Sequence, residues 1–312
     1  MNRRVLVTGA SGFIGRRALI ELVARGFEVH AVARIPPAPS PANVHWHRAD
    51  LLQAASRRAL LAEVDAGDLL HLAWYAEPGA FWMARENAAW VAATVCLVDE
   101  FAAAGGRRAV LAGTCGEYDW SAEQPLHEDA LLRPATFYGV CKDATRRVVE
   151  DLAERVGVSL AWARVFFLYG PGENERRLVS GVAKRLVSGE RAQTSAGTQR
   201  RDFLHVDDVA NAFAALLDCE VTGVLNIASG ESVTVRSVVD EVAQAAGRPD
   251  LLDIGALPPR ASDPDEIVAD VTRLREEVGF TPAWTLADGV RQTVAWWRDQ
   301  AGGRSNTSSS VA

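Results

Sequence analysis

The first half of the chain alternates short apolar runs with segments in which apolar residues recur every three or four positions. Strands alternating with helices in this way predict a parallel, doubly wound α/β sheet. Gly26 stands where the first helix would end in a left-handed conformation. Strands are expected at residues 4–8, 28–34, 44–47, 68–73, 108–114 and 159–167, and helices at 13–25, 85–104 and 138–156.

After Leu168 this pattern is looser. One strand is expected at 224–228, helices at 178–188, 207–218, 232–246 and 286–299, and irregular chain at 250–270. We interpret residues 1–168 as one domain and residues 169–300 as a smaller lobe, some segments of which return to the sheet. The Gly- and Ser-rich residues 301–312 are predicted to be a disordered tail.

The composition narrows the class of protein. With 312 residues, 48% of them hydrophobic, the chain can bury a sizeable core, and its net charge of −7 argues against a nucleic-acid partner. The four cysteines lack metal-binding spacing, so no metal site is predicted. Reduced thiols without a signal-peptide pattern indicate a cytoplasmic protein. The apolar stretch 87–105 contains Asp99 and Glu100, so we expect a buried helix there and no membrane span.

Three glycines, Gly9, Gly12 and Gly15, lie between the first strand and the first helix. Glycines there permit a tight turn and a close approach of the backbone to a pyrophosphate, and the helix N-terminus supplies N–H donors. Residues 1–168 are therefore predicted to bind a dinucleotide. The loop residues expected to contact it are Gly9, Ser11, Gly12, Phe13, Ile14 and Gly15.

The end of the second strand discriminates between the two nicotinamide dinucleotides. A carboxylate there would bind the ribose 2′-hydroxyl of NAD, whereas an arginine suits the 2′-phosphate of NADP. This strand ends in Arg34 without a carboxylate, which favours NADP(H) over NAD(H). Asp50 and Leu51 follow the third strand and are placed to meet the adenine; alternatively, Asp50 is a capping residue.

Tyr138 and Lys142 stand four positions apart near the start of an expected helix, so both side chains lie on one face of it. A free phenol has a pKa of about 10, and a nearby ammonium favours the phenolate and lowers that value. A tyrosine tuned in this way can exchange a proton with a sugar hydroxyl or carbonyl.

The chain resembles the extended short-chain dehydrogenase/reductase family, the group of sugar-nucleotide epimerases, dehydratases and 4-ketoreductases. The resemblance covers residues 5–297 and rests on segments 8–15, 50–51, 71–73, 138–142, 169–172 and 201–208, with Asn87 and Thr114. It implies a Rossmann-type doubly wound sheet that holds the dinucleotide and a C-terminal lobe that holds a nucleotide-diphosphate sugar. It also implies a homodimer formed through helices 85–104 and 138–156.

The resemblance further implies a role for each matching residue. Tyr138 would be the acid/base, Lys142 would bind the nicotinamide ribose and tune Tyr138, and Thr114 would hydrogen-bond the reacting sugar oxygen. Guanidinium groups suit a diphosphate, and Arg201 and Arg260 would pair with it. Two of these residues could instead have purely structural roles: Thr114 as a cap at the end of its strand, and Arg201 in an ion pair with Asp202 or Asp207. The remaining residues that would lie along the dinucleotide are Leu72, Ala73, Trp74 and Asn87.

Some residues differ from the family pattern, and these differences argue against particular reactions of the family. The 4,6-dehydratases follow the threonine with an Asp-Glu pair, where this chain has Cys115-Gly116, which argues against dehydration. No histidine lies between Leu131 and His205 to serve a ring-proton transfer of the fucose-synthase type. Phe167 replaces an asparagine that contacts the sugar nucleotide in many relatives. The aromatic segment 74–82 either walls an apolar 6-deoxy sugar or packs as a small core beneath a loop.

Three functions follow as hypotheses. The first is NADPH-dependent reduction of a nucleotide-activated 4-keto-6-deoxy sugar, which needs only Thr114, Tyr138 and Lys142 as reacting groups. The second is a nucleotide-sugar 4-epimerase that oxidises and reduces C4 again on a retained NAD. The third is a dinucleotide-binding regulator without catalysis, against which the presence of these three residues counts.

Overall fold

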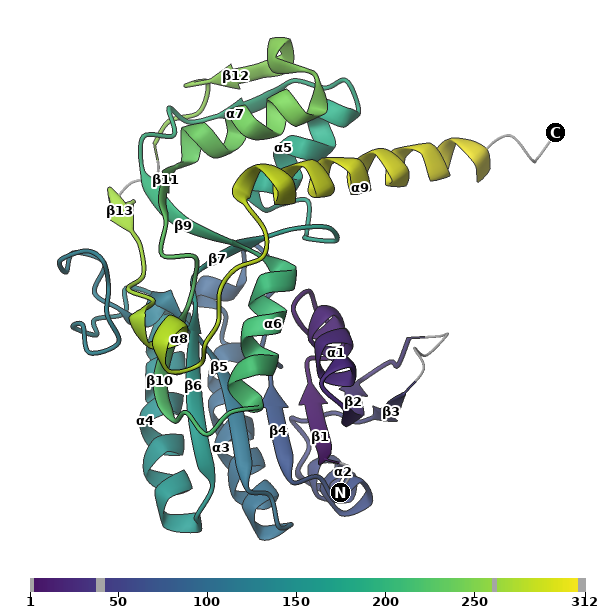
Figure 1. Cartoon of the computed structure of the whole chain (residues 1–312), viewed down its shortest axis with the longest axis vertical. Helices are drawn as coiled ribbons and strands as arrows, with labels where there is room; N and C mark the ends of the chain where they lie inside the picture. The colour runs from purple at the N-terminus through teal and green to yellow at the C-terminus, as the bar shows by residue number, and fades with distance from the viewer. Residues whose placement is uncertain (1–2, 38–42, 260–262, 308–312) are drawn as a thin grey trace.

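The structure is a computed structural model that describes residues 3–37, 43–259 and 263–307. A sheet of seven parallel strands forms its centre, in the order β10-β6-β5-β4-β1-β2-β3 (Figure 1). The predicted doubly wound α/β class is confirmed. The strands are β1 Arg3–Thr8, β2 Phe27–Ala33, β3 Val44–Arg48, β4 Asp68–His71, β5 Arg108–Thr114, β6 Ser159–Val165 and β10 Gly223–Ile227.

Helices cover both faces of this sheet. On one face, α1 (Gly15–Ala24) and α6 (Val206–Leu217) share an apolar cluster with Val5 and Val7 of β1. On the other, α2 (Ala54–Val64), α3 (Glu86–Ala103) and α4 (Phe137–Val156) share one with Leu6 (Figure 1). Strands buried on both faces carry continuous apolar runs. For this reason their positions were predictable to within a few residues.

The helix α2 was not predicted from the sequence. Its buried face consists of Arg57, Leu60, Leu61 and Val64, which have helical spacing but include an arginine. Burial of Arg57 is compensated because its Nε donates to Glu100 on α3 over 2.9 Å and its guanidinium also donates to the Leu51 carbonyl over 2.8 Å. A pattern that counts arginine as polar therefore does not detect this helix.

The C-terminal lobe contains a small sheet in the order β11-β9-β13, with β7 beside β9. The predicted strand 159–167 is divided in the structure: β6 stays in the large sheet, and β7 leaves it to pair with β9. Where the structure describes the region expected to be irregular, 250–270, it holds two short strands. The lobe's strands are β7 Phe167–Tyr169, β8 Ala192–Thr194, β9 Arg200–His205, β11 Ser232–Thr234, β12 Leu252–Ile254 and β13 Glu266–Ile267.

Three helices of the lobe pack together on a separate apolar cluster: α5 (Leu178–Val187), α7 (Val235–Ala246) and α9 (Leu286–Thr307). The short helix α8 (Thr272–Glu276) packs beside β10, which returns from the lobe to the large sheet. The helix α9 continues past the predicted boundary at residue 300, so it includes the first part of the tail that was predicted to be disordered. None of the described helices combines the length and hydropathy that a membrane span needs.

Candidate active site at the carboxyl ends of the strands

The glycine loop closes tightly against the chain that follows β4. Gly9 has a φ of +67°, and a Cβ there would lie 2.7 Å from the backbone nitrogen of Ala73. A Cβ on Gly15 would lie 2.2 Å from the Gly9 carbonyl oxygen. Ser11 and Gly12 are exposed, and the N-terminus of α1 has no side-chain cap. The exposed, uncapped N-terminus of α1 therefore has backbone donors that suit a phosphate.

A buried hydrogen-bond chain holds the segment after β4 in place. The Thr8 hydroxyl lies 2.7 Å from His71 Nδ1 and accepts from the Ala73 N–H, while His71 Nε2 lies 3.0 Å from the Thr94 hydroxyl. Burial, with a smaller contribution from Lys142, lowers the pKa of His71 to about 3. His71 is therefore neutral and structural, and it fixes Leu72 and Ala73 opposite the glycine loop.

Arg34 and Asp50 lie at the carboxyl ends of β2 and β3, on the same edge of the sheet as the glycine loop. Arg34 is exposed and forms no ion pair within the described part of the chain. Asp50 acts as a local cap, since its carboxylate accepts from the Leu52 N–H over 3.1 Å. Leu51 is buried. Arg34 is therefore available to a ligand at this edge, while Asp50 has the capping role that the sequence left open.

Thr114 ends β5 and begins a 3-10 turn, Cys115–Glu117. Its hydroxyl accepts from the Gly116 N–H over 3.2 Å, and its own N–H donates to the Glu117 carboxylate over 2.9 Å. Thr114 therefore does cap the end of the strand, and the same Thr114 hydroxyl lies beside Tyr138. Burial raises the pKa of the Cys115 thiol to about 12, so this thiol is a neutral, packed group.

The first turn of α4 rests on the 3-10 turn Cys115–Glu117. Thr136 caps the helix by accepting from the Gly139 N–H over 3.1 Å. A Cβ on Gly139 would lie 2.2 Å from the Gly116 carbonyl oxygen, so only glycine permits this approach. The contact brings the Tyr138 phenol within hydrogen-bonding reach of Thr114.

We expect Gly139→Ala to destabilise the protein by about 1–3 kcal/mol, because the new methyl forces α4 away from the Gly116 carbonyl. The measurement is chemical denaturation together with turnover. Gly302→Ala in α9 is the matched control, since a Cβ there meets nothing within 4 Å. Equal stability and activity of the Gly139→Ala and wild-type proteins would contradict the tight contact.

Lys142 is buried beside Tyr138, as the four-residue spacing predicted. Its Nζ donates to the Ala112 carbonyl over 2.7 Å and lies 3.9 Å from the centre of the Trp74 ring. Burial lowers the pKa of Lys142 to about 7, and Glu117 acts in the opposite direction. The prediction of a lowered pKa for Tyr138 is wrong for this structure: burial raises the pKa of this phenol, and the interaction with Thr114 offsets only part of the rise.

Three aromatic rings surround the Tyr138 ring edge-on. The centroids of Trp74, Phe81 and Trp82 lie 6.5, 5.0 and 5.9 Å from that of Tyr138. Asn87, which was predicted to lie along the dinucleotide, is fully buried. It accepts from the Trp74 indole over 2.7 Å and donates to the Phe81 carbonyl over 2.8 Å. Its amide therefore holds the aromatic segment around the phenol.

The sequence reasoning missed Arg177, the residue before α5. Its guanidinium lies 5.2 Å from the centre of the Phe81 ring, and it is one of the groups that lower the pKa of Tyr138. Arg177 is exposed, so a ligand anion can reach it. In the sequence it is one of two adjacent arginines beyond a turn, which is typical of any solvated helix start.

Arg201 is buried and already paired. It donates to the Asp263 carboxylate over 2.6 Å and to the Pro264 carbonyl over 2.9 Å. Neither alternative considered from the sequence is its partner: Asp202 accepts from the N–H groups of Ser229 and Gly230, and Asp207 lies 3.3 Å from Arg17. Arg260 lies outside the described residues.

Phe167 packs beneath this pair, with its ring centre 5.5 Å from the Arg201 guanidinium. It also lies 5.9 Å from the Phe203 ring. The side chain that replaces the asparagine of many relatives is therefore part of the packing of β7 against β9.

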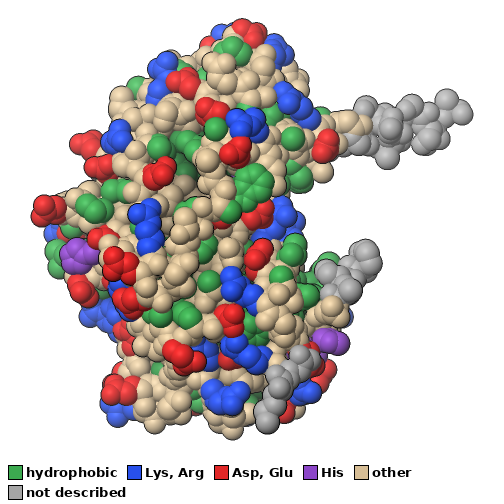
Figure 2. Space-filling model, in the orientation of Figure 1, with side chains coloured by type: hydrophobic (Ala, Val, Ile, Leu, Met, Phe, Trp, Pro, Cys, Tyr) green, Lys and Arg blue, Asp and Glu red, His purple; other side chains and the backbone are tan. Residues whose placement is uncertain are grey.

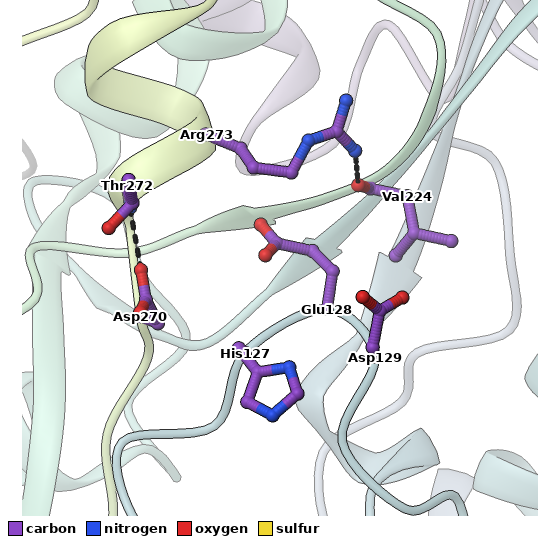
Figure 3. A pocket seen from close by; sticks show the side chains of 7 residues that line it. All are labelled: His127, Glu128, Asp129, Val224, Asp270, Thr272 and Arg273. Carbon is purple, nitrogen blue, oxygen red and sulfur yellow. Dashed lines mark hydrogen bonds between the residues drawn. The ribbon is translucent and has the colours of Figure 1, made fainter.

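An open cavity of about 480 Å³ lies elsewhere, beside the edge strand β10 (Figure 3). Its polar groups are engaged locally: Glu128 accepts from the Asn226 N–H over 2.9 Å, and Asp270 accepts from the Thr272 N–H over 2.7 Å. Among the residues placed by the structure, no group of three or more potential ligands could hold a metal ion. On the face in Figure 2, acidic and basic side chains are interspersed.

The fold and this edge of the sheet define an α/β protein of the dinucleotide-binding class, in which Thr114, Tyr138 and Lys142 lie together. The NAD dependent epimerase/dehydratase family model matches residues 5–228, so the chain belongs to that family. It is an NAD(P)-dependent oxidoreductase of the extended short-chain dehydrogenase/reductase type.

Curated relatives match nearly the whole chain. A UDP-glucose 4-epimerase of Streptomyces lividans is 28% identical over 95% of this chain and 96% of its own. A dTDP-4-dehydro-6-deoxyglucose reductase of Escherichia coli is 24% identical over 93% and 96%. Among solved structures, MoeE5 in complex with UDP-glucose and NAD is 33% identical, with a TM-score of 0.83 over 96% of this chain and 99% of that one.

Proposed function

We propose that the protein is an NADPH-dependent reductase of a nucleotide-activated 4-keto-6-deoxy sugar. The observation that carries this proposal is the small set of reactive groups beside the glycine loop: Thr114, Tyr138 and Lys142, with no acid–base pair at Cys115 and Gly116. Removing water from a sugar needs an additional acid and base, whereas reducing a ketone needs one hydride and one proton.

In this reaction a bound NADPH would supply the hydride that C4 of the sugar accepts. Tyr138 gives its phenolic proton to the oxygen that was the carbonyl, and it regains a proton from solvent afterwards. Thr114 donates to the same oxygen and holds it against Tyr138. The Lys142 ammonium binds the nicotinamide ribose and stabilises the phenolate that forms when the proton leaves.

The same residues support a second candidate, an NAD-dependent nucleotide-sugar 4-epimerase. Several of the relatives are named UDP-glucose 4-epimerase, and the MoeE5 structure contains UDP-glucose and NAD. Our preference for NADP(H) rests on Arg34, which is exposed at the end of β2 without an acidic neighbour on that strand end. A regulator without catalysis is the least favoured function, because the reactive groups are intact.

The substrate in this proposal is a nucleotide-diphosphate sugar bound by the C-terminal lobe. Arg177 is an exposed cation beside Tyr138, and Arg201 would have to exchange Asp263 for phosphate. The aromatic segment 74–82 would pack against the apolar 6-methyl group of the sugar.

The proposal also includes a division of the chain into two domains at residue 168 and a cytoplasmic location. It includes a homodimer through α3 and α4 as well, since Val140 and Val148 of α4 are 47% and 48% exposed.

The test is a comparison of two assays on the purified protein. We expect oxidation of NADPH with a nucleotide-activated 4-keto-6-deoxy sugar, and no interconversion of UDP-glucose and UDP-galactose without added cofactor. A Thr114→Val variant controls for contaminating reductases. If the protein retains stoichiometric NAD and inverts a 4-hydroxyl without NADPH, the reductase proposal fails and the epimerase takes its place.

A further inference from the structure

Glu117 has no part in the chemistry proposed above, yet its carboxylate lies directly behind the reactive residues. The Glu117 carboxylate is fully buried and accepts hydrogen bonds from three donor groups. The Thr114 N–H donates over 2.9 Å, the Trp162 indole N–H over 3.0 Å, and Arg164 Nε over 2.7 Å. Since it cannot reach solvent, Glu117 cannot touch a substrate, and any effect on the reaction must pass through its neighbours.

The surrounding chain is shaped to receive this carboxylate. A Cβ on Gly113 would lie 2.2 Å from the Trp162 indole nitrogen and 2.8 Å from Glu117 Oε1. A larger residue at position 113 would therefore collide with the hydrogen bond between Trp162 and Glu117. Arg164, also buried, donates further to the Glu128 carbonyl over 2.9 Å and lies over the Tyr118 ring at 4.4 Å. The arrangement is therefore a built site for one carboxylate.

Besides the Ala112 carbonyl of β5 and the Trp74 ring, side chains from four elements lie around Lys142. The strand β4 contributes His71, which is neutral; α4 contributes Tyr138, whose ring centre is 6.0 Å from Nζ; and β6 contributes Trp162 at 5.8 Å. The 3-10 turn contributes Glu117. Its carboxylate accepts from the indole N–H of Trp162, the ring that lies 5.8 Å from Lys142 Nζ, and its charge raises the pKa of Lys142. The adjacent Asp143 is paired with Arg146 and Arg147 instead.

We propose that Glu117 is a positioning residue of the active site: its carboxylate holds the Thr114 end of β5 and keeps the Lys142 side chain in the ammonium form. The effect of Glu117 on kcat rests on the proposed function, in which Tyr138 and Lys142 take part in the reaction. The effect of the Glu117 charge on the protonation of Lys142 does not depend on that function, so the two effects can be tested separately. Without this carboxylate, an amine buried between Trp74 and Trp162 would have no nearby anion to offset the cost of desolvation.

The lysine content of the chain makes a direct test possible, because Lys142 and Lys184 are its two lysines. Protein labelled with ¹³Cε-lysine gives two titrating signals, and Lys184→Arg assigns them. In the wild-type protein we expect Lys142 to titrate near pH 7. Glu117→Gln is expected to lower that midpoint by about one pH unit or more while Lys184, paired with Glu175 on the surface, is unchanged.

Activity provides the second measurement. The ammonium persists only below its pKa, so a lower pKa moves the alkaline limb of the kcat profile to lower pH. Above both midpoints a shift of one unit leaves about one tenth of the ammonium, so kcat there should fall about tenfold. If the NMR midpoint moves and the kcat profile does not, the role of Lys142 in the proposed function fails, and the coupling to Glu117 stands.

Glu117→Gln leaves Arg164 buried without its partner and could unfold the protein for that reason. The double variant Glu117→Gln/Arg164→Met removes both charges and should show the same shift of Lys142. Glu128→Gln is the matched control, because Glu128 lies in the same network but is absent from the groups acting on Lys142. An unchanged Lys142 midpoint in the double variant would overturn the proposal and leave Glu117 as a purely structural ion-pair partner.

Discussion

Tyr138→Phe is expected to lower kcat by roughly 10²- to 10⁴-fold, the range that a positioned general acid or base contributes. The substitution keeps the ring and therefore its edge-on contacts with Phe81 and Trp82, at 5.0 and 5.9 Å. It removes only the hydroxyl, the group on which Thr114 acts. Cofactor affinity should hence stay close to that of the wild-type protein, so the loss appears in turnover.

Turnover and cofactor binding are measured separately, the first by absorbance of the nicotinamide and the second by quenching of tryptophan fluorescence. Tyr169→Phe is the control, since that phenol donates to the Leu286 carbonyl over 3.2 Å within the lobe. Near-normal turnover by Tyr138→Phe, with Tyr169→Phe also active, would exclude Tyr138 as the proton donor.

Arg34→Asp is expected to reduce kcat/KM for NADPH by roughly 10- to 100-fold, because a hydrogen bond to a charged group contributes about 1.5–3 kcal/mol. The new carboxylate also repels the 2′-phosphate, and it can accept from the ribose hydroxyl of NADH. The value for NADH should therefore stay similar or improve. The side chain is exposed, so the substitution should leave the melting temperature unchanged.

The comparison is made as a ratio of the two cofactors in each protein. Arg236→Asp on α7 is the charge-matched control, because its partner Asp240 lies one helical turn away in the lobe. Equal losses with NADPH and NADH would show that Arg34 does not bind the 2′-phosphate. A wild-type protein that already prefers NADH would lead to the same conclusion.

Much of the fold was predictable because the central strands are buried on both faces and the glycine loop must join one of them to a helix. The errors have local physical causes. The helix α2 was missed because Arg57 occupies its buried face and pairs with Glu100. The segment 159–167 was assigned to one strand because the separation of β7 from β6 depends on pairing with β9, distant in the sequence.

Prediction of the site was less complete. Tyr138, Lys142 and Thr114 were identified by spacing and by family resemblance, and the structure brings them together. Arg177 and Glu117 were not identified, because nothing in the local sequence distinguishes either of them from an ordinary surface charge. The direction of the Tyr138 pKa was also wrong, because burial by Trp74, Phe81 and Trp82 outweighs the expected effect of a nearby ammonium.

By itself, the sequence determined the doubly wound sheet, the dinucleotide loop and the pairing of Tyr138 with Lys142, because these depend on local periodicity and on residues a few positions apart. Only the tertiary structure decided which charges are buried and with whom they pair. Glu117 meets Arg164 across 47 positions, and Arg201 meets Asp263 across 62. Desolvation and ion pairing depend on such distant contacts, and burial of this kind shifts the pKa values of Tyr138 and Lys142.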